Sequence, residues 1–217
     1  MLDHLLRQRA CRSFTDDVVG DDDLAIMLRA ATHAPSAENS QPWMFVVVRD
    51  PDTRRAIAEL TRRVWQGGAR QHAEQHLRAP FLEAVDTFVH GGYGGAPVLV
   101  VVAGDGRTGA SDALLASSVF PAAQNLLLAA AALGYGSSMT TLAAHAPDQL
   151  ARIVALPAGV RPFAVVPIGR SASALGPPRR RPVHEVAHLD SFGVPFPPVS
   201  DPPPAPAARR PPAPRPS

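Results

Sequence analysis

The chain has 217 residues, a formal net charge of +2 and 46% hydrophobic residues, which suffice for one domain with a buried core. Its 21 basic residues are all Arg, whose guanidinium group pairs well with phosphate, so an anionic ligand must be bound by Arg. These Arg residues are scattered or lie near the C-terminus, and no basic face interleaved with aromatic residues occurs, which argues against a nucleic-acid partner.

Three features of the sequence predict a cytoplasmic protein. Cys11 is the single cysteine, which excludes an intrachain disulfide and a cysteine-rich metal site and fits a reducing compartment. Residues 2–10 mix acidic, basic and amide side chains with apolar ones, unlike a secretory signal. The longest apolar run, residues 113–133, contains Ser, Pro, Gln and Asn, so we expect a buried core helix and no membrane span.

The first elements are two helices separated by a basic motif. Residues 2–9 carry Leu at helical spacing and predict a short helix that ends near Arg9. Residues 9–14 then read Arg-Ala-Cys-Arg-Ser-Phe; taken alone, these Arg residues would be the solvated end of a helix. Three Asp residues at 21–23 are expected to cap and begin a second helix that reaches about His33.

Residues 34–43, Ala-Pro-Ser-Ala-Glu-Asn-Ser-Gln-Pro-Trp, form a junction between that helix and an apolar strand at 44–48. Pro35 and Pro42 stiffen the backbone, because each fixes its own φ and biases the preceding residue away from the helical region. Ser, Asn and Gln between them offer short polar side chains on a rigid backbone, as the binding of a planar polar heterocycle requires. A surface turn is the alternative, since the same residue types dominate turns.

The middle of the chain alternates helices with an apolar strand. A helix with Pro at its first position follows Asp50. In the polar helical segment after it, His72 and His76 share one face and could bind a metal, but no third ligand of matching spacing follows, so we expect solvated side chains and no metal site. Gly residues at 91–95 are expected to form a flexible hinge before residues 97–103, a Val-rich strand buried on both faces.

A long apolar helix is expected over residues 112–133, and a helix that is apolar on all sides belongs in a core or an interface. Small residues at 134–142 predict a short strand and a turn. A further helix and the apolar strand at 164–168 complete an α+β domain whose sheet is covered by helices. Residues 195–217 include eleven Pro, a composition that predicts a disordered or polyproline-like tail after a domain of residues 1–194.

The motifs of residues 7–48 resemble the amino-terminal part of the FMN-dependent nitroreductase family. They comprise a basic motif that ends in Phe14, a helix, a Pro-Ser-x-x-Asn-x-Gln-Pro-Trp turn and an apolar strand. Other landmarks of the family recur in order to about Gly193. The resemblance implies a nitroreductase-like α+β fold with a central, mostly antiparallel sheet covered by helices. It also implies a homodimer in which the long apolar helix forms the interface.

The resemblance implies an FMN site built from several segments. The basic motif would hold the phosphate and the ribityl chain, although Gln8 and Ala10 stand where the family usually has Arg and Ser, which would weaken this grip. The turn would serve the flavin of the partner chain. Residues 139–141 would lie along the flavin ring, where their Thr-Thr pair resembles the iodotyrosine deiodinase branch. Arg180 would be a second phosphate ligand, although an Arg triplet is also typical of a solvated patch. The predicted cofactor-binding residues are Gln8, Arg9, Ala10, Arg12, Pro35, Ser36, Ala37, Asn39, Gln41, Met139, Thr140, Thr141 and Arg180.

The sequence contains no nucleophile with a base, no zinc set and no paired-carboxylate site, as expected where a flavin carries the chemistry and no side chain is itself catalytic. The resemblance implies an oxidoreductase that takes hydride from NAD(P)H at flavin N5 and passes electrons to a small organic acceptor, such as a nitroaromatic or a quinone. Two alternatives stay open. Residues 165–170 resemble cyclic dipeptide oxidases, which dehydrogenate a substrate and return electrons to oxygen. The departures at Gln8 and Ala10 would suit a non-catalytic flavin-binding protein.

The helix at 112–133 also bears on assembly. Because it is apolar on every side and too extensive for one domain to cover, it predicts an obligate dimer with a two-fold interface. A charge placed at Leu127 is therefore expected to lower dimerisation and FMN content together.

Overall fold

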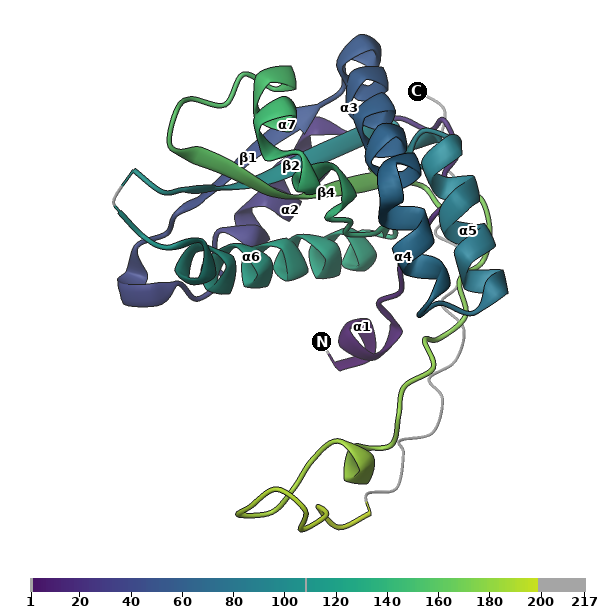
Figure 1. Cartoon of the computed structure of the whole chain (residues 1–217), viewed down its shortest axis with the longest axis vertical. Coiled ribbons are helices and arrows are strands. Elements are labelled where there is room, and N and C mark those ends of the chain that lie inside the picture. Colours follow the sequence, from purple (N-terminus) through teal and green to yellow (C-terminus); the bar gives the residue numbers. More distant parts are fainter. Residues whose placement is uncertain (1, 108, 199–217) are drawn as a thin grey trace.

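The computed structural model describes residues 2–107 and 109–198, in which a four-stranded sheet lies between two layers of helices (Figure 1). The order across the sheet is β1-β2-β4-β3, and within these residues all neighbouring strands are antiparallel. The predicted α+β fold, with a mostly antiparallel sheet covered by helices, is confirmed. The strands are β1 (Trp43–Val48), β2 (Val98–Asp105), β3 (Gly136–Ser137) and β4 (Val160–Gly169).

β2 is the centre of the core, because its side chains are buried on both faces of the sheet. Val98, Val100 and Val102 pack against one layer of helices, while Leu99 and Val101 pack against the other. None of the five is more than 2% exposed. This strand is the Val-rich run that the sequence predicted to be buried on both faces, and that prediction is confirmed.

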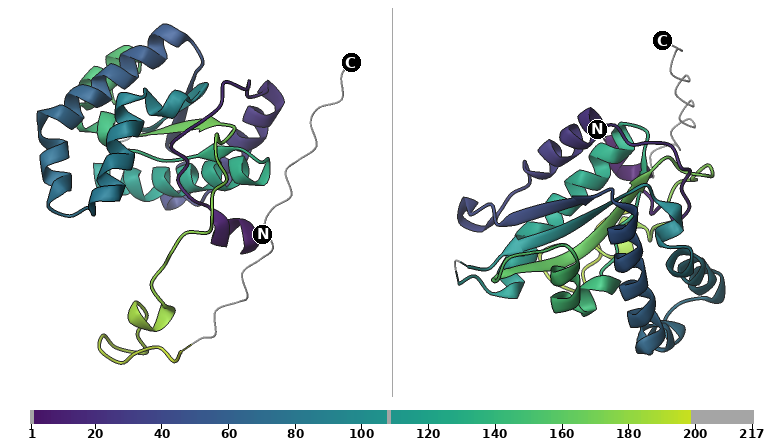
Figure 2. Two further views of the ribbon diagram at one scale, coloured as in Figure 1. Left: turned by 90° about the vertical axis from the view of Figure 1, so that its right-hand side faces the viewer. Right: turned by 90° about the horizontal axis from the view of Figure 1, so that it is seen from above.

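The two layers divide the helices between the faces of the sheet, as Figure 2 shows from two further sides. α2 packs alongside α6 on one face, and the hydrophobic cluster on the other face is completed by α3, α5 and α7. Each of these helices turns apolar side chains toward the sheet. The helices are α1 (Leu2–Arg7), α2 (Asp21–Ala31), α3 (Pro51–Val64), the π-helical turn Trp65–Ala69, α4 (Arg70–Glu74), α5 (Ala79–His90), α6 (Asp112–Ala132) and α7 (Pro147–Ile153).

Two helix starts show how local sequence sets the boundaries. Asp50 caps α3, because its carboxylate accepts hydrogen bonds from the amide (2.7 Å) and the hydroxyl (2.6 Å) of Thr53, and Pro51 occupies the first helical position. The start of α2 differs from the prediction. Its N-cap is Gly20, which has no side chain to cap with. The three Asp residues lie in the first turn, where their negative charges interact favourably with the positive end of the helix dipole.

α6 is less evenly buried than its composition predicts. Its inner side packs on the sheet and on α2, whereas Leu114 is 45% exposed. Leu127 is 4% exposed and belongs to the core of its own chain. A charge at Leu127 would therefore disrupt the core of its own chain, and its predicted effect on dimerisation and FMN content stays a prediction. By length and composition α6 could cross a membrane, but 44% of its most apolar stretch is buried inside the protein.

After β4 the chain leaves the layers and forms an arm, residues 172–198, that extends away from the body (Figures 1 and 2). It contains one 3₁₀-helical turn (Val183–Glu185) and a loop in which the amide of Phe196 donates to the carbonyl of Ala187 (3.0 Å). Apolar side chains of the arm are exposed, Phe192 by 93%. The predicted boundary after residue 194 stays a prediction, and residues 199–217 of the predicted tail lie outside the described residues.

Candidate functional site

The basic motif is fixed by backbone hydrogen bonds to three different parts of the fold. It runs beside β3, the end of β4 and the loop before β2, and Ala10 forms a parallel bridge with Ser137. Because these bonds hold main-chain atoms, the path of the motif does not depend on the side chains of Arg9 and Arg12. Each bond runs from an amide to a carbonyl over 2.9 to 3.0 Å: Cys11 to Ser137, Phe14 to Gly94, Thr15 to Arg170, and Ala172 to Ser13.

Gly94 lies directly against the backbone of the basic motif. A Cβ added at this position would be 2.0 Å from the carbonyl oxygen of Arg12, and the φ of Gly94 is +65°. Only glycine satisfies both conditions. The prediction that residues 91–95 form a flexible hinge is therefore wrong: this glycine run is a packed support for residues 12–14.

Arg9 and Arg12 carry cationic groups that no carboxylate pairs with in residues 2–107 and 109–198. Arg9 is exposed, and its Nη1 donates to the carbonyl of Gly176 (3.3 Å). Arg12 is half-buried, and its Cζ lies 4.7 Å from the centre of the Phe81 ring. Burial, and then the charge of Arg9, lower the pKa of Arg12. Two neighbouring cations, one of them partly desolvated, form a site that an anion such as phosphate would stabilise.

Residues 138–141 continue from β3 along the edge of β4. Thr140 exchanges both backbone hydrogen bonds with Val165, at 3.0 and 2.9 Å. The side chains of Met139 and Thr141 are exposed. The hydroxyl of Ser138 is buried and has no hydrogen-bond partner, the one such side-chain atom in the described ranges. Since a buried hydroxyl normally finds a partner, this orphan marks a place where a ligand atom is expected.

The turn at Pro35 to Gln41 is held in an unusual backbone conformation. Glu38, Asn39 and Gln41 all have positive φ, at 55°, 52° and 47°, a region that is unfavourable for residues other than glycine. The strain is stabilised locally by two hydrogen bonds. The hydroxyl of Ser36 accepts from the main-chain amide of Gln41 (3.0 Å), and the side-chain Oδ1 of Asn39 accepts from Nε2 of Gln41 (3.1 Å). The side chains of Asn39 and Gln41 are exposed.

The turn and the basic motif lie at opposite ends of the sheet. The turn leads into Trp43, which pairs with Gly104, and the amide of Ala37 donates to the hydroxyl of Ser118 (3.2 Å) near the start of α6. The basic motif joins the sheet at Ser137, beyond the other end of β2. Gly104 lies six residue steps along β2 from Val98, which corresponds to about 20 Å. One chain therefore brings together Gln8 to Arg12 and Met139 to Thr141, but not the predicted residues of the turn.

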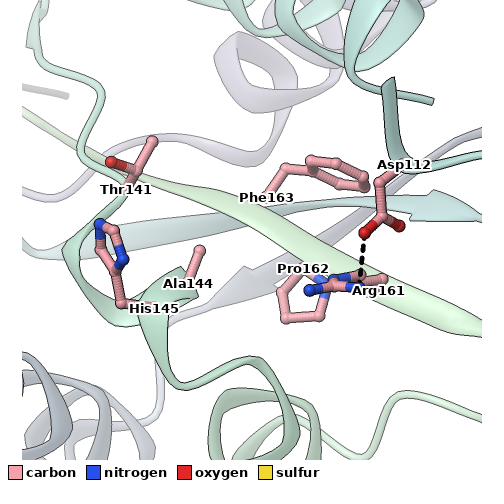
Figure 3. A pocket seen from close by; sticks show the side chains of 7 residues that line it. All are labelled: Asp112, Thr141, Ala144, His145, Arg161, Pro162 and Phe163. Atoms are coloured by element: carbon pink, nitrogen blue, oxygen red, sulfur yellow. Dashed lines mark hydrogen bonds and ion pairs between the residues drawn. The ribbon is translucent and has the colours of Figure 1, made fainter. Parts of the chain in front are cut away.

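Beyond Thr141, a cavity of about 220 Å³ opens where α6, the 3₁₀ turn Leu142–His145 and β4 meet (Figure 3). Thr141 and His145 lie on one side of it, and an ion pair between Arg161 and Asp112 (2.6 Å) lies on the other, with the Phe163 ring between them. The sequence predicts a strand only over residues 164–168, and its motifs assign no role to residues 161–163. No motif could have identified them, because the cavity depends on how α6 crosses the strand.

Arg180 lies on the arm, is exposed, and donates from Nη1 to the carbonyl of Arg179 (3.0 Å). It follows Gly176, which contacts Arg9, by four residues, and its role as a phosphate ligand stays a prediction. His72 and His76 are exposed, with ring centres 4.8 Å apart. In the part of the chain that the structure describes, no group of three or more His, Cys, Asp or Glu side chains could hold a metal ion.

Comparison with known proteins identifies what this arrangement is similar to. The Nitroreductase family model matches residues 5–170. A protein of Thermus thermophilus named NADH dehydrogenase is 29% identical over 193 residues, covering 83% of this chain and 91% of that one. The iodotyrosine deiodinase of Thermotoga neapolitana is 27% identical over 175 residues, covering 75% and 84%. A nitroreductase structure with bound FMN from Desulfitobacterium hafniense aligns with a TM-score of 0.69 at 20% identity, covering 87% and 97%. Because the family model spans most of the chain, the protein belongs to the nitroreductase family.

Proposed function

We propose that this protein binds FMN in a site shared by two copies of the chain and passes electrons from NAD(P)H to a small organic acceptor, such as a nitroaromatic or a quinone. Family membership makes the protein an FMN-dependent oxidoreductase. The observation that carries the proposal is the bridge between Ala10 and Ser137, which places the cationic motif beside the strand edge at residues 138–141.

Two observations on this chain fit a flavin mononucleotide. The guanidinium of Arg12 is half-buried and makes no hydrogen bond to the described residues, so its donors are available for a phosphate. The buried hydroxyl of Ser138 lacks a partner on the neighbouring segment, so a polar atom of a ligand would satisfy it. Both vacant groups lie on segments that the Ala10 bridge joins, as one elongated ligand requires.

When bound, FMN supplies the two-electron chemistry, and the protein binds and orients it. Arg9 and Arg12 hold the phosphate end, with Arg180 as a further ligand. Gln8 and Ala10 contribute main-chain atoms where the family usually has side-chain contacts. Met139, Thr140 and Thr141 support the ring from the edge of β4. This segment is held in place because Thr140 and Val165 exchange two main-chain hydrogen bonds. Pro35, Ser36, Ala37, Asn39 and Gln41 serve the flavin of the other copy.

The shared site follows from the separation of its two halves. The turn lies about 20 Å from the basic motif along β2, and both are fixed by hydrogen bonds to different elements. A second copy related by a two-fold axis would bring the turn of one chain to the basic motif of the other, twice per dimer. The exposed apolar side chains of the arm, including Phe192 and Val194, are suited to contact that second copy.

The cavity beside Thr141 is the place that we assign to the electron acceptor. Its walls combine the Phe163 ring with polar groups of Thr141 and His145, and it adjoins the segment that supports the flavin ring. Aromatic and polar walls of this kind suit a small planar molecule that carries oxygen atoms. The buried, reduced Cys11 is consistent with the cytoplasmic location that we propose.

Purification and turnover test this function. The purified protein should be yellow and release FMN, but not FAD, on denaturation, and it should oxidise NAD(P)H when a nitroaromatic or a quinone is added. A colourless protein that does not take up added FMN would contradict the proposal. If only an organic substrate such as a cyclic dipeptide reduced the flavin, the dehydrogenase alternative would replace it. FMN binding without any turnover would identify a flavin-binding protein.

A further inference from the structure

We infer that Phe81 is a positioning residue, whose ring holds the Arg12 side chain in place for the phosphate of FMN. This inference rests on the proposed FMN site. It is drawn from the contact between the two side chains, in which Cζ of Arg12 lies 4.7 Å from the centre of the Phe81 ring. A guanidinium at this distance from a ring is attracted by the negative charge of its face.

Arg12 needs such a support, because little else fixes its side chain. Within the described residues its guanidinium donates no hydrogen bond to the protein and pairs with no carboxylate. The positive charge of Arg9 repels the positive charge of Arg12. A side chain with four rotatable bonds would otherwise sample many conformations and lose more entropy on binding a ligand. The Phe81 ring restricts it without occupying its donors, so the five N–H groups stay available.

Phe81 is otherwise unexplained by the packing of the chain. Its side chain is 42% exposed. Its neighbour Leu82 packs against the hydrophobic cluster under the sheet, whereas Phe81 belongs to no such cluster. Its contact with Arg12 gives it a role.

The helix that carries Phe81 is held firmly. Phe81 lies in the first turn of α5, directly after Pro80, and Phe88 and Val89 of the same helix are buried in the core. Farther along α5, Asp86 accepts hydrogen bonds from Trp65 (2.7 Å) and Arg70 (3.0 Å). The ring is therefore mounted on a fixed element.

The same part of the chain holds Arg12 at two points. α5 is followed by residues 91–95. Within them, Gly94 packs against the carbonyl of Arg12, and its own carbonyl accepts a hydrogen bond from the amide of Phe14. Gly94 therefore fixes the main chain of the motif, and Phe81 fixes the side chain. The segment from residue 79 to 95 acts as one support for the phosphate ligand.

Binding of FMN and of riboflavin, which lacks the phosphate, separates a positioning role from a structural one. Dissociation constants for both flavins should be measured with the apo form of the full chain for the wild type, Phe81→Leu, Phe81→Tyr, Arg12→Ala and the Arg12→Ala/Phe81→Leu double variant. Leu keeps an apolar side chain but removes the ring face, whereas Tyr keeps the ring. We expect Phe81→Leu to weaken FMN binding by about 3- to 30-fold and to leave riboflavin binding within about twofold. Tyr should restore FMN binding. In the Arg12→Ala background, Phe81→Leu should have no further effect, because the group it positions is gone.

The outcomes distinguish this inference from the function on which it rests. Equal losses for FMN and riboflavin in Phe81→Leu, or no loss for either, would overturn the positioning role while leaving the FMN site intact. Additive losses in the double variant would overturn it too. If the wild type bound neither flavin, or if Arg12→Ala did not reduce the preference for FMN over riboflavin, the proposed FMN site itself would fail, and the role of Phe81 with it.

Discussion

The basic motif at residues 9–14 and the turn at residues 35–41 carry the two halves of the predicted flavin site, and the fold treats them differently. The motif is bound through its main chain to three separate elements. The turn is held chiefly by hydrogen bonds among its own residues and contacts α6 through a hydrogen bond from the amide of Ala37 to the hydroxyl of Ser118. The first is therefore a fixed platform within one chain, whereas the second is a strained and exposed projection, suited to contact another molecule.

The platform should be the more sensitive of the two regions to a main-chain change. Gly94→Ala would place a Cβ 2.0 Å from the carbonyl oxygen of Arg12 at a φ of +65°. We expect it to lower the free energy of unfolding by more than about 3 kcal/mol and to abolish FMN retention. Thermal melting and the flavin content of the purified protein measure both effects.

Gly109→Ala is the matched control, because Gly109 also has a positive φ, +83°, but no atom lies within 4 Å of an added Cβ. This variant should lower the free energy of unfolding by about 1 kcal/mol and leave FMN content unchanged. Similar losses in the two variants would mean that the close packing under Arg12 is unimportant, and the platform would then be no more rigid than an ordinary loop.

Arginine side chains on the platform and on the arm should control affinity for the cofactor with little effect on folding. Arg9→Ala and Arg180→Ala should each weaken FMN binding by more than roughly 1.5 kcal/mol, because a hydrogen bond to a charged group is lost. Arg181→Ala, next to Arg180 on the exposed arm, is the control and should bind FMN as the wild type does. Unchanged affinity in Arg180→Ala would place the second phosphate ligand elsewhere.

The stability of α5, the helix that supports the platform, should depend on pH through the ionisation of Asp86. Hydrogen bonds from Arg70 and then from Trp65 hold the pKa of this carboxyl below its ordinary value of 3.8. Its stabilising effect is therefore complete above pH 3.8 and is lost as the pH falls through the lower folded-state value. Asp86→Asn should lower stability by about 1 kcal/mol near neutral pH. The difference in melting temperature between the wild type and this variant should shrink on acidification. A difference that stayed constant down to about pH 2 would show that the Asp86 charge is not involved.

The sequence predicted the fold well where local pattern and burial agree. The Val-rich run of β2, the start of α3 with Pro51 at its first position and the long α6 were all expected and are confirmed. The errors arose where tertiary packing decides. Gly94 looked like part of a hinge because glycine permits motion, but it also permits close packing. Leu127 was expected to report on a dimer interface because α6 is apolar throughout, yet only the fold determines which side of α6 faces the sheet.

The candidate site was predictable only in part for the same reason. Family motifs pointed to Arg9, Arg12 and residues 139–141, and the structure brings those segments together. Phe81 was not expected, because its partner Arg12 lies 69 residues away in the sequence. The cavity at Thr141 was missed too, since its walls come from three elements. Contacts between distant segments leave no periodic signal in one sequence.

Complementation between two inactive variants tests the shared site most directly. Arg12→Ala removes a phosphate-binding side chain from the platform, and Asn39→Gly removes a side chain from the turn at a positive φ that glycine adopts without strain. Each homodimer should retain little FMN. If the site is shared, a heterodimer of the two variants contains one site with both changes and one with neither, so it should bind one FMN per two chains with the affinity of the wild type. Heterodimers that bind no more FMN than their parents, or a wild-type monomer with FMN fully bound, would contradict a site built from two chains.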